Sequence, residues 1–388
     1  MNKNVLFVVD ERCMGGVSIL LSDMLNMIDL TNLNVDVLVL HDRGDMLTDL
    51  PESVNVIYGT PYFSAIDLSI KEVIKSKNIK TMFRKFMTVF DMKTGLVKNK
   101  IIRERKKILK KHYDYEIAFK DGYTALFTAY GDSDIKYHWI QYDYGIGNPN
   151  AKYPNLFNEV LPTFDKIISV SDGVANDFNN IYHLEDKVEI IDNLINVDKI
   201  KEKSLEQCDV ELDNNKINII CVGRLLNAHK GFDRLIDAID KLNKDNLFND
   251  CILRIYGDGP DKETIHKQIM DYKLNDKIKL CGRVNNPFKY YKGNDLFILP
   301  SRYEAFGLVI VEAMVLGVPA LVTKNGATAK LVKDGFNGKI VENTDEGIYL
   351  GLRELLVNKE TLKSYKENLI NYEYDNKRII ESIESLFK

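Results

Sequence analysis

Short apolar runs alternate with amphipathic stretches along most of the chain. The runs are rich in Val and Ile and apolar throughout, which is typical of strands covered on both faces of a sheet. Such alternation predicts an α/β fold with parallel, doubly wound sheets. The first series of expected strands covers residues 5–9, 35–40, 54–58, 115–119, 137–142, 166–170 and 188–191. A second series covers residues 217–222, 252–256, 277–280, 296–299 and 319–322, with helices at 232–242 and 308–316.

The restart of the strand series at residue 217 predicts two domains. A chain of 388 residues favours the same number. The polar stretch 196–218 separates the two series and is interpreted as a linker. We therefore expect one domain over 1–200, onto which the last amphipathic segment, about 372–388, packs back, and a second over 201–371. Two such domains would face a central cleft at the carboxyl ends of their strands, where open α/β sheets bind ligands.

Composition excludes several classes of protein. Apolar residues make up 45% and charged residues 28% of the chain, which is the ordinary globular balance and excludes general disorder. No apolar run reaches the ~18 residues that a membrane span needs. The first residues are typical of a buried strand rather than a signal segment. The 5 cysteines are widely spaced without a CxxC pair, so neither a disulfide framework nor a zinc site is expected, and the reducing cytoplasm is the expected compartment.

Positive charge is concentrated in one segment. The net charge is -4, yet residues 71–111 hold 15 Lys/Arg against 3 Asp/Glu. Residues 82–87 place aromatics and Met at helical spacing between cations, and 101–111 continue the pattern. A basic amphipathic helix is typical of an element on an anionic membrane surface. The alternative is a solvated helical face whose apolar side packs on the domain. Nucleic acid is not an expected partner, because no recognition module accompanies the charge.

A loop suited to an anionic group follows the expected strand 217–222. Gly223 and Arg224 come directly after the strand, and Lys230 precedes a helix, so two cations would stand beside helix amides. Arg can fork onto phosphate oxygens, and glycine allows close backbone approach. The alternative is that the cations only cover the surface and the glycines only form turns. The P-loop pattern GxxxxGK[ST] is absent, and G-D-G-P at 257–260 favours a tight strand-to-helix turn over a dinucleotide loop.

Two carboxylates flank the start of the helix expected at 308–316. Glu304 would lie in the loop before this helix and Glu312 in its second turn, with the free amides of Phe306, Gly307 and Leu308 between them. A carboxylate can accept two vicinal hydroxyls, so this layout suits a ligand with a phosphate between two polyols, as in a sugar nucleotide. The alternative is a pair of surface glutamates.

Taken together, these motifs resemble the retaining glycosyltransferases of family 4 (glycosyl transferases group 1) of the bacterial surface-polysaccharide type. The resemblance rests on G-R-L and K-G within 223–231, G-D-G-P, P-S-R-Y-E at 300–304, and the Glu304/Glu312 pair followed by Ala-Met. Gly317-Val318-Pro319 and Asn325-Gly326 add to it, and the similarity is weaker at 15–17, 164–171 and 187–193. It implies the GT-B fold of two Rossmann-like domains.

The resemblance also implies a role for each matching residue. Arg224 and Lys230 would bind the donor diphosphate, Glu312 the ribose hydroxyls, and Glu304 the hydroxyls of the transferred sugar. Further contacts to the nucleotide sugar would come from Gly15, Gly16, Gly223, Arg283, Val284, Phe306, Gly307 and Leu308. Neither a cofactor nor a metal ion is expected, because protein cations and helix amides would neutralise the diphosphate.

The sequence departs from the family pattern at two places. Gln141 stands where similar proteins often have a histidine in W-I-H-x-D, and Gln can hydrogen-bond a sugar hydroxyl but cannot hold a proton as His does. Gln141 therefore stays a catalytic candidate, together with Glu304, Arg224 and Lys230, while a histidine base is in doubt. His138 is expected in the core or on the surface. Lys330 replaces a common Glu in a loop that helps to choose the sugar, so the sugar stays open.

The resemblance implies retaining transfer of a hexose or N-acetylhexosamine from a nucleotide sugar, with UDP as the expected nucleotide. The acceptor would be a glycan, a polymer or a lipid-linked precursor in cell-surface polysaccharide or glycoconjugate synthesis. The reaction would be front-face attack assisted by the leaving diphosphate. The enzyme would be cytoplasmic and peripheral at the inner face of the plasma membrane. The alternative is a non-catalytic, sugar-nucleotide-binding partner subunit of a glycosyltransferase complex.

Overall fold

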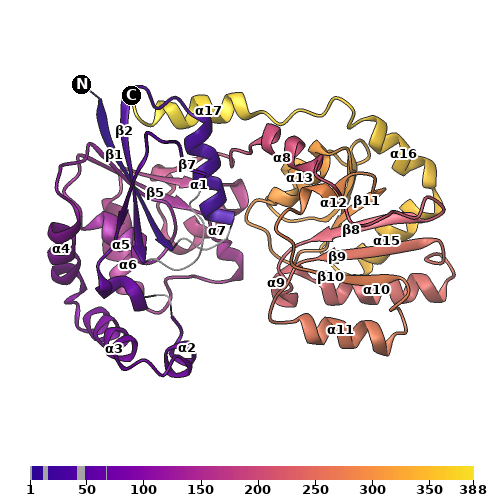
Figure 1. Ribbon diagram of the computed structural model, residues 1–388, viewed down its shortest axis with the longest axis horizontal. Helices are drawn as coiled ribbons and strands as arrows, with labels where there is room; N and C mark the ends of the chain where they lie inside the picture. The colour runs from indigo at the N-terminus through magenta and orange to yellow at the C-terminus, as the bar shows by residue number, and fades with distance from the viewer. Residues whose placement is uncertain (1, 12–15, 42–48, 67) are drawn as a thin grey trace. The chain divides into compact units, whose positions relative to one another are not determined.

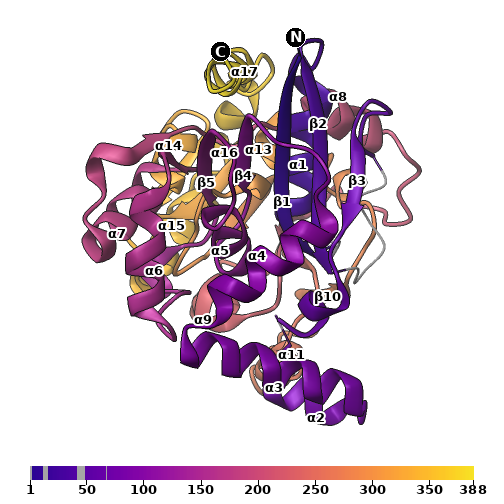
Figure 2. The ribbon, with the colours of Figure 1, turned by 90° about the vertical axis from the view of Figure 1, so that its left-hand side faces the viewer.

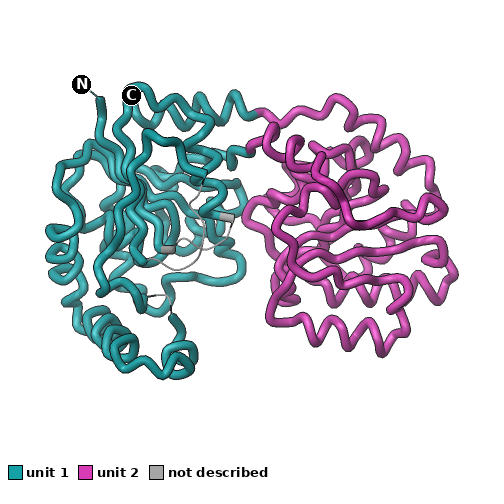
Figure 3. Tube along the Cα trace, viewed as in Figure 1, with its two compact units in different colours: residues 1–195, 376–388 teal, residues 196–375 magenta. Residues whose placement is uncertain are grey.

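The protein consists of two compact units, each built around its own sheet. The computed structural model describes residues 2–11, 16–41, 49–66 and 68–388. Unit 1 comprises Met1–Ile195 and Asn376–Lys388, and unit 2 comprises Asn196–Asp375 (Figures 1 and 3). The predicted boundary at residue 200 falls inside helix α8 (Val197–Ser204), which opens unit 2.

Unit 1 contains a parallel sheet in the order β3-β2-β1-β4-β5-β6-β7. The register places Val5 of β1 opposite Val35 of β2 on one side and Tyr115 of β4 on the other. The strand order therefore reverses between β1 and β4. The strands are β1 (Lys3–Glu11), β2 (Leu33–His41), β3 (Asn55–Tyr58), β4 (Tyr115–Ala118), β5 (Ile135–Ile140), β6 (Lys166–Ser169) and β7 (Val188–Ile190).

The helices of unit 1 connect these parallel strands. The α-helices are α1 (Gly16–Met27), α2 (Ile70–Lys75), α3 (Ile79–Thr94), α4 (Val97–Ile108), α5 (Tyr123–Ala129), α6 (Pro154–Val160), α7 (Asp172–Tyr182) and α17 (Asn376–Ser385). Short 3-10 turns occur at η1 (Pro61–Ala65), η2 (Tyr144–Ile146), η3 (Leu161–Thr163) and η4 (Glu185–Lys187). Figure 2 shows α2 and α3 below the strands of the unit, with α4 running up beside the sheet.

The C-terminal segment packs on unit 1 through α17. Phe387 makes edge contacts with Phe7 of β1 and Tyr115 of β4. The Arg378 guanidinium lies 2.8 Å from the carboxylate of Asp192. These apolar and ionic contacts make residues 376–388 part of the first unit, although 180 residues of unit 2 precede them in the chain.

Unit 2 contains a second parallel sheet in the order β10-β9-β8-β11-β12-β13, which reverses between β8 and β11. Its strands are β8 (Ile217–Val222), β9 (Cys251–Tyr256), β10 (Ile278–Gly282), β11 (Leu296–Leu299), β12 (Ala320–Thr323) and β13 (Gly338–Val341). Besides α8, its helices are α9 (Asn227–Lys230), α10 (Phe232–Lys244), α11 (Lys262–Asp271), α12 (Phe288–Tyr291), α13 (Leu308–Val315), α14 (Thr328–Leu331), α15 (Asp345–Val357) and α16 (Lys359–Glu367).

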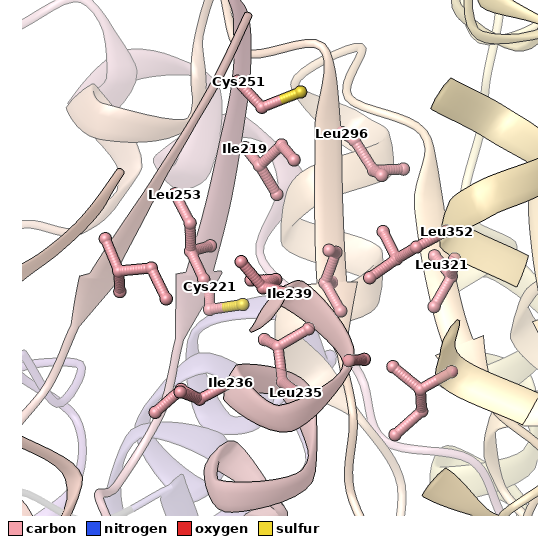
Figure 4. Packing of buried hydrophobic residues seen from close by; sticks show 14 of the residues in the cluster. Ile219, Cys221, Leu235, Ile236, Ile239, Cys251, Leu253, Leu296, Leu321 and Leu352 are labelled. Atoms are coloured by element: carbon pink, nitrogen blue, oxygen red, sulfur yellow. The ribbon is translucent and has the colours of Figure 1, made fainter. Parts of the chain in front are cut away.

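Apolar clusters cover both faces of the unit 2 sheet. On one face, Ile219 and Cys221 of β8 pack against Leu235 and Ile239 of α10 and Leu352 of α15 (Figure 4). Neighbouring positions on the strands face a separate cluster that includes Ile220, Phe297, Ile310 and Met314. Burial on both faces explains why these strands are apolar throughout. Every strand expected from the apolar runs overlaps an observed strand, so the predicted doubly wound α/β fold is confirmed; β13 was not predicted.

Helix α4 packs against unit 1, although its sequence is rich in cations. Val97 and Ile101 are fully buried, and the side chain of Arg105 is also buried. The Arg105 guanidinium donates to both carboxylate oxygens of Glu116 in β4, at 2.9 Å to Oε2, and lies over the ring of Phe127. Burial raises the pKa of the Glu116 carboxyl, and the Arg105 charge opposes this shift. Residues 101–111 therefore do not expose all of their cations, because Arg105 is buried.

We predict that Arg105→Ala lowers the free energy of unfolding by about 3–5 kcal/mol, because Glu116 would stay buried without its partner. The matched control is Arg103→Ala on the exposed side of the same helix, which should change stability by less than about 0.5 kcal/mol. Urea unfolding of both variants measures the difference. Equal losses in the two variants would show that the Arg105–Glu116 pair has no special role.

Candidate functional site

The two motifs of unit 2 converge at the switch point of its sheet. β8 pairs with β9 on one side and with β11 on the other. At such a reversal the loops that follow the two central strands leave in opposite directions, and the crevice between them is where open α/β sheets bind ligands. The loop 223–231 follows β8, and the loop 300–307 follows β11. The topology thus brings together two motifs that lie about 75 residues apart in the chain.

The carbonyl of Pro300 fixes the two loops to each other. Gly231 has a φ of +65°, and a Cβ at this position would lie 2.3 Å from the Pro300 oxygen, so only glycine fits. The buried guanidinium of Arg234 donates two N–H groups to the same oxygen, at 2.9 and 2.6 Å. Burial, together with the charge of Arg302, lowers the pKa of Arg234 to about 10. The close approach at Gly231 and the buried guanidinium of Arg234 therefore form one anchor between the two loops.

A second anchor joins the loops through Arg302. Its guanidinium donates to both oxygens of Asp233, at 2.7 and 2.9 Å. Its backbone N–H donates to the carbonyl of His229 at 2.7 Å. A bidentate Arg–carboxylate pair is geometrically specific, so this contact sets the orientation of the loop that carries Glu304.

Lys230 and Glu304, expected to hold the diphosphate and the sugar, are in direct contact. The Lys230 ammonium lies 2.6 Å from Glu304 Oε2, and the side chains are 23% and 12% exposed. The hydroxyl of buried Ser301 donates to the same oxygen at 3.4 Å. An ammonium has three N–H donors, so Lys230 can hold Glu304 and still reach an oxygen of a ligand.

The loop 223–231 carries further positive charge. Arg224 is exposed, and within the described ranges 2–11, 16–41, 49–66 and 68–388 its guanidinium makes no hydrogen bond or ion pair. His229 is partly buried, and burial together with the charges of Lys230 and Arg224 lowers the pKa of its imidazole. Positive charges crowded enough to disfavour another proton form a suitable environment for an anion.

The G-D-G-P turn at 257–260 packs against the backbone of the loop 223–231. A Cβ on Gly257 would lie 1.9 Å from the Gly223 oxygen, and one on Gly259 would lie 2.3 Å from the Leu225 oxygen. The Leu225 N–H donates to the Asp258 carbonyl at 3.0 Å. The turn connects β9 to α11, so the interpretation of 257–260 as a tight strand-to-helix turn is confirmed.

Helix α13 places Glu312 beyond its N-terminus. Phe306 is buried, Gly307 has a φ of +96°, and the helix begins at Leu308, where its first amides have no partner within the helix. The hydroxyl of Tyr291 in α12 donates to Glu312 Oε2 at 3.1 Å. Burial and the Glu312 charge raise the pKa of Tyr291 well above its ordinary value. The sequence analysis missed Tyr291; the signal available was that a buried tyrosine hydroxyl needs a partner.

Arg283 and Val284 lie at the same edge of the sheet, two strands away from β8. They follow Gly282, the last residue of β10, which has a φ of +76°. The Gly282 carbonyl accepts from Gly257 at 2.8 Å, so the ends of β9 and β10 are joined. Val284 packs against the cluster around Phe297. Arg283 is exposed beside it.

In unit 1, the structure describes some but not all of the predicted site residues. Gly15 lies outside the described residues, and Gly16 is the first residue of α1. Gln141 follows β5, and its Nε2 atom is buried without a partner in the part of the chain that the structure describes. His138 is fully buried on Phe164, with Nε2 3.3 Å from Asp121 Oδ1, which confirms a core position.

Polar residues that the sequence analysis did not single out end the neighbouring strands. The ammonium of Lys120, after β4, lies 2.6 Å from the carboxylate of Asp10 in β1. The hydroxyl of Tyr144 donates to Asp121, also after β4. The available signal was a polar residue directly after each apolar run, since carboxyl ends of parallel strands share one edge. These groups lie where the order of the unit 1 sheet reverses.

Two further properties of the described residues concern metal ligands and membrane spans. Among them, no three His, Cys, Asp or Glu side chains are grouped so that they could hold a metal ion. No helix within the same ranges is both long enough and apolar enough to cross a bilayer.

Comparisons with known proteins agree with this architecture. The fold matches that of Anabaena HepE, solved with UDP and glucose, at a TM-score of 0.71 and 18% identity over 99% of both chains. TarM matches at a TM-score of 0.72 and 16% identity, over 100% of this chain and 99% of that one. The fold is therefore that of the GT-B glycosyltransferases.

Sequence comparison matches part of the chain to a glycosyltransferase family. Residues 203–372 match the family described as "Glycosyl transferases group 1". The chain is 28% identical over 270 residues to an uncharacterized glycosyltransferase of Haemophilus influenzae, covering 67% of this chain and 72% of the relative. It is 29% identical over 214 residues to the N-acetylgalactosamine-N,N'-diacetylbacillosaminyl-diphospho-undecaprenol 4-alpha-N-acetylgalactosaminyltransferase of Campylobacter jejuni, covering 54% of this chain and 56% of that enzyme. Residues 203–372, which lie in unit 2, are thus similar to the glycosyl transferases group 1.

We predict that Tyr291→Phe lowers the free energy of unfolding by about 1.5–3 kcal/mol, because it removes a buried hydrogen bond to the Glu312 carboxylate. The neighbouring Tyr290→Phe is the matched control, since its hydroxyl donates to the exposed Asp209 and should contribute less than about 1 kcal/mol. Urea unfolding measures both. An equal effect of the two substitutions would contradict the role of Tyr291 in holding Glu312.

Proposed function

We propose that this protein is a retaining glycosyltransferase whose donor site is the switch point of unit 2. It transfers a hexose or N-acetylhexosamine from a UDP-sugar to a glycan, polymer or lipid-linked acceptor. The observation that carries the proposal is the convergence of the Lys230–Glu304 pair, Arg224 and the N-terminus of α13 at one point of the sheet. An anionic group flanked by hydroxyl-bearing rings fits this arrangement of charges.

The order of the groups along α13 matches the order of the parts of a sugar nucleotide. Glu304 precedes the helix and receives the hydroxyls of the sugar, while the amides of Phe306, Gly307 and Leu308 receive phosphate or sugar oxygens. Glu312 lies four residues into the helix, about 6 Å further along its axis at 1.5 Å per residue, and receives the ribose hydroxyls. Arg224 and Lys230 bind the diphosphate from the other loop. Gly223, Arg283 and Val284 add further contacts in unit 2.

The barrier of the reaction is charge separation between the sugar and the departing diphosphate. Lys230, Arg224 and the helix amides stabilise the diphosphate, and one well-placed donor of this kind contributes about 2.7–4 kcal/mol. Glu304 faces the sugar, which becomes positively charged. The bond from the anomeric carbon to the phosphate oxygen breaks, and the acceptor oxygen attacks from the same face. The acceptor proton passes to the departing phosphate, so no protein base is needed, and Gln141 serves as a hydrogen-bonding group.

The names of similar proteins support the choice of substrates. HepE was solved with UDP and with UDP-glucose. The Campylobacter jejuni relative is named for transfer of N-acetylgalactosamine to a diphospho-undecaprenol-linked sugar. A protein of 41.2 kDa from a Klebsiella pneumoniae cps region is also similar, at 29% identity over 168 residues. They favour a lipid-linked acceptor, surface-polysaccharide synthesis and a position at the inner face of the plasma membrane.

The direct test is release of UDP from a panel of UDP-sugars, with and without acceptor, in EDTA. We expect turnover without a divalent ion, because protein cations supply the positive charge.

Arg224→Ala should weaken UDP binding about ten- to hundredfold in calorimetry, because one charge-assisted contact is lost. Arg353→Ala, on the exposed side of α15, is the control and should leave affinity unchanged. If the protein bound UDP-sugars but released no UDP with any acceptor present, the alternative would be favoured, namely a non-catalytic partner subunit.

The two glutamates should separate binding from turnover. Glu312→Ala should weaken UDP and UDP-sugar alike, because its contacts are to the ribose. Glu304→Ala should leave UDP affinity nearly intact and lower kcat, because its contacts strengthen as the sugar becomes cationic. Calorimetry with UDP and steady-state kinetics measure the two effects. If Glu304→Ala weakened UDP as much as Glu312→Ala, the assignment of sugar and ribose ends would be reversed or wrong.

A further inference from the structure

Helix α3 carries an apolar stripe on the side that faces away from unit 1. The stripe, called here the α3 stripe, recurs at three- and four-residue spacing and so forms one face of the helix. Its side chains are between 44% and 81% exposed, and two of its rings, Phe86 and Phe90, stack on each other. The α3 stripe consists of Ile79, Met82, Phe83, Phe86 and Phe90. Ile70 and Ile74 of α2 add exposed apolar surface beside it.

The orientation of α3 is fixed by polar contacts on its inner side. Arg84 donates to the Ser64 hydroxyl at 3.1 Å, and the Lys85 ammonium donates to the Ile66 carbonyl at 2.8 Å. Asp91 is buried and accepts from Tyr62 at 3.0 Å. The hydrogen-bonding side of α3 therefore faces the protein, and its apolar side faces outward. Rotation that would bury the α3 stripe would break these contacts.

Cations border the stripe, whereas the acids of the same segment are engaged elsewhere. The exposed lysines are Lys71, Lys75, Lys77, Lys80 and Lys93. Of the three acids in 71–111, Glu72 caps α2, and Asp91 is buried. Glu104 is buried in α4 and accepts from Lys107 at 2.8 Å. The surface of α2 and α3 is thus apolar and positive. Figures 1 and 2 show these two helices below the strands.

We propose that α2 and α3 form the surface by which this protein binds an anionic phospholipid bilayer. Rings and aliphatic side chains enter the boundary between headgroups and acyl chains, and the lysines remain at the level of the phosphates. The charge argues against a second copy of this chain, because pairing two such faces would bring like charges together. The proposal goes beyond the donor chemistry and does not depend on it, since binding to vesicles requires no turnover.

The charge and the apolar stripe make separable contributions. Each lysine near an anionic surface adds to the attraction, and this part of the binding weakens as salt rises. The buried rings contribute in proportion to their apolar area and depend little on salt. Binding should therefore need anionic lipid, decrease with salt, and require the aromatic residues as well.

The test is cosedimentation of the full chain with vesicles of phosphatidylcholine alone or mixed with phosphatidylglycerol. We expect binding to the mixed vesicles and little binding to phosphatidylcholine. Phe83→Ser with Phe86→Ser should weaken it at least about tenfold, from the apolar area lost. Val357→Ser with Ile370→Ser, which changes equally exposed apolar residues of unit 2, should leave it unchanged. Lys75→Glu with Lys80→Glu should weaken binding at low salt, and Lys267→Glu with Lys363→Glu should not.

Insertion itself can be followed by Phe86→Trp. Its emission should shift to shorter wavelength on mixed vesicles and be quenched by brominated acyl chains, while the single native tryptophan, Trp139, is buried and supplies a constant background. Equal binding by the stripe variants and their controls, or no quenching of the new tryptophan, would overturn the proposal. A third result would also overturn it: the protein is a dimer in lipid-free solution, and Phe83→Ser with Phe86→Ser dissociates the dimer while vesicle binding persists. The α3 stripe would then be a protein interface.

Discussion

The geometry of the loops 223–231 and 300–307 depends on the contact between Gly231 and the carbonyl of Pro300. The approach is so close that no side chain fits at Gly231. The guanidinium of Arg234 is buried beside it, and hydrogen bonds to the oxygens of Pro300 and Asn343 offset the desolvation of its charge. Arg234 belongs to α10, and α10 packs its apolar side against β8 and α15. The hydrophobic core of unit 2 therefore positions the loop that follows β11. A substitution in that core would be expected to move Glu304 relative to Lys230 as well as to lower stability.

Much of the fold could be predicted because burial on both faces of a sheet leaves a local signal. Apolar runs located the strands, and the motifs after β8 and β11 were recognisable from residue type and spacing. β13 left a weaker signal, because it has only four residues, includes Lys339 and pairs on one side only. Tyr291 and Asp121 could not be assigned roles, since their partners come from topology rather than from neighbouring positions. The same holds for Arg105, whose partner Glu116 lies on a strand.

Helices α3 and α4 show a limit of amphipathic patterns. Both are basic and have one apolar side, yet α4 buries Val97 and Ile101 whereas α3 exposes Phe83 and Phe86. Periodicity identifies an apolar face but not what covers it. For α3 the decision comes from polar contacts with η1 and its flank, which involve Ser64 and Tyr62 from outside the helix. The sequence pattern alone therefore could not distinguish the two helices, and only tertiary contacts show that α4 buries its apolar side whereas α3 exposes it.

The ion pair between Lys230 and Glu304 gives the proposed reaction a preorganised field. Without ligand, the two charges satisfy each other at 2.6 Å while both are largely shielded from water. In the proposed complex, a donor between the loops would place its diphosphate toward Lys230 and its sugar toward Glu304. As the anomeric bond breaks, negative charge grows beside the ammonium and positive charge beside the carboxylate. Both interactions therefore become stronger in the transition state than in the ground state, which is the condition for raising kcat rather than merely tightening binding.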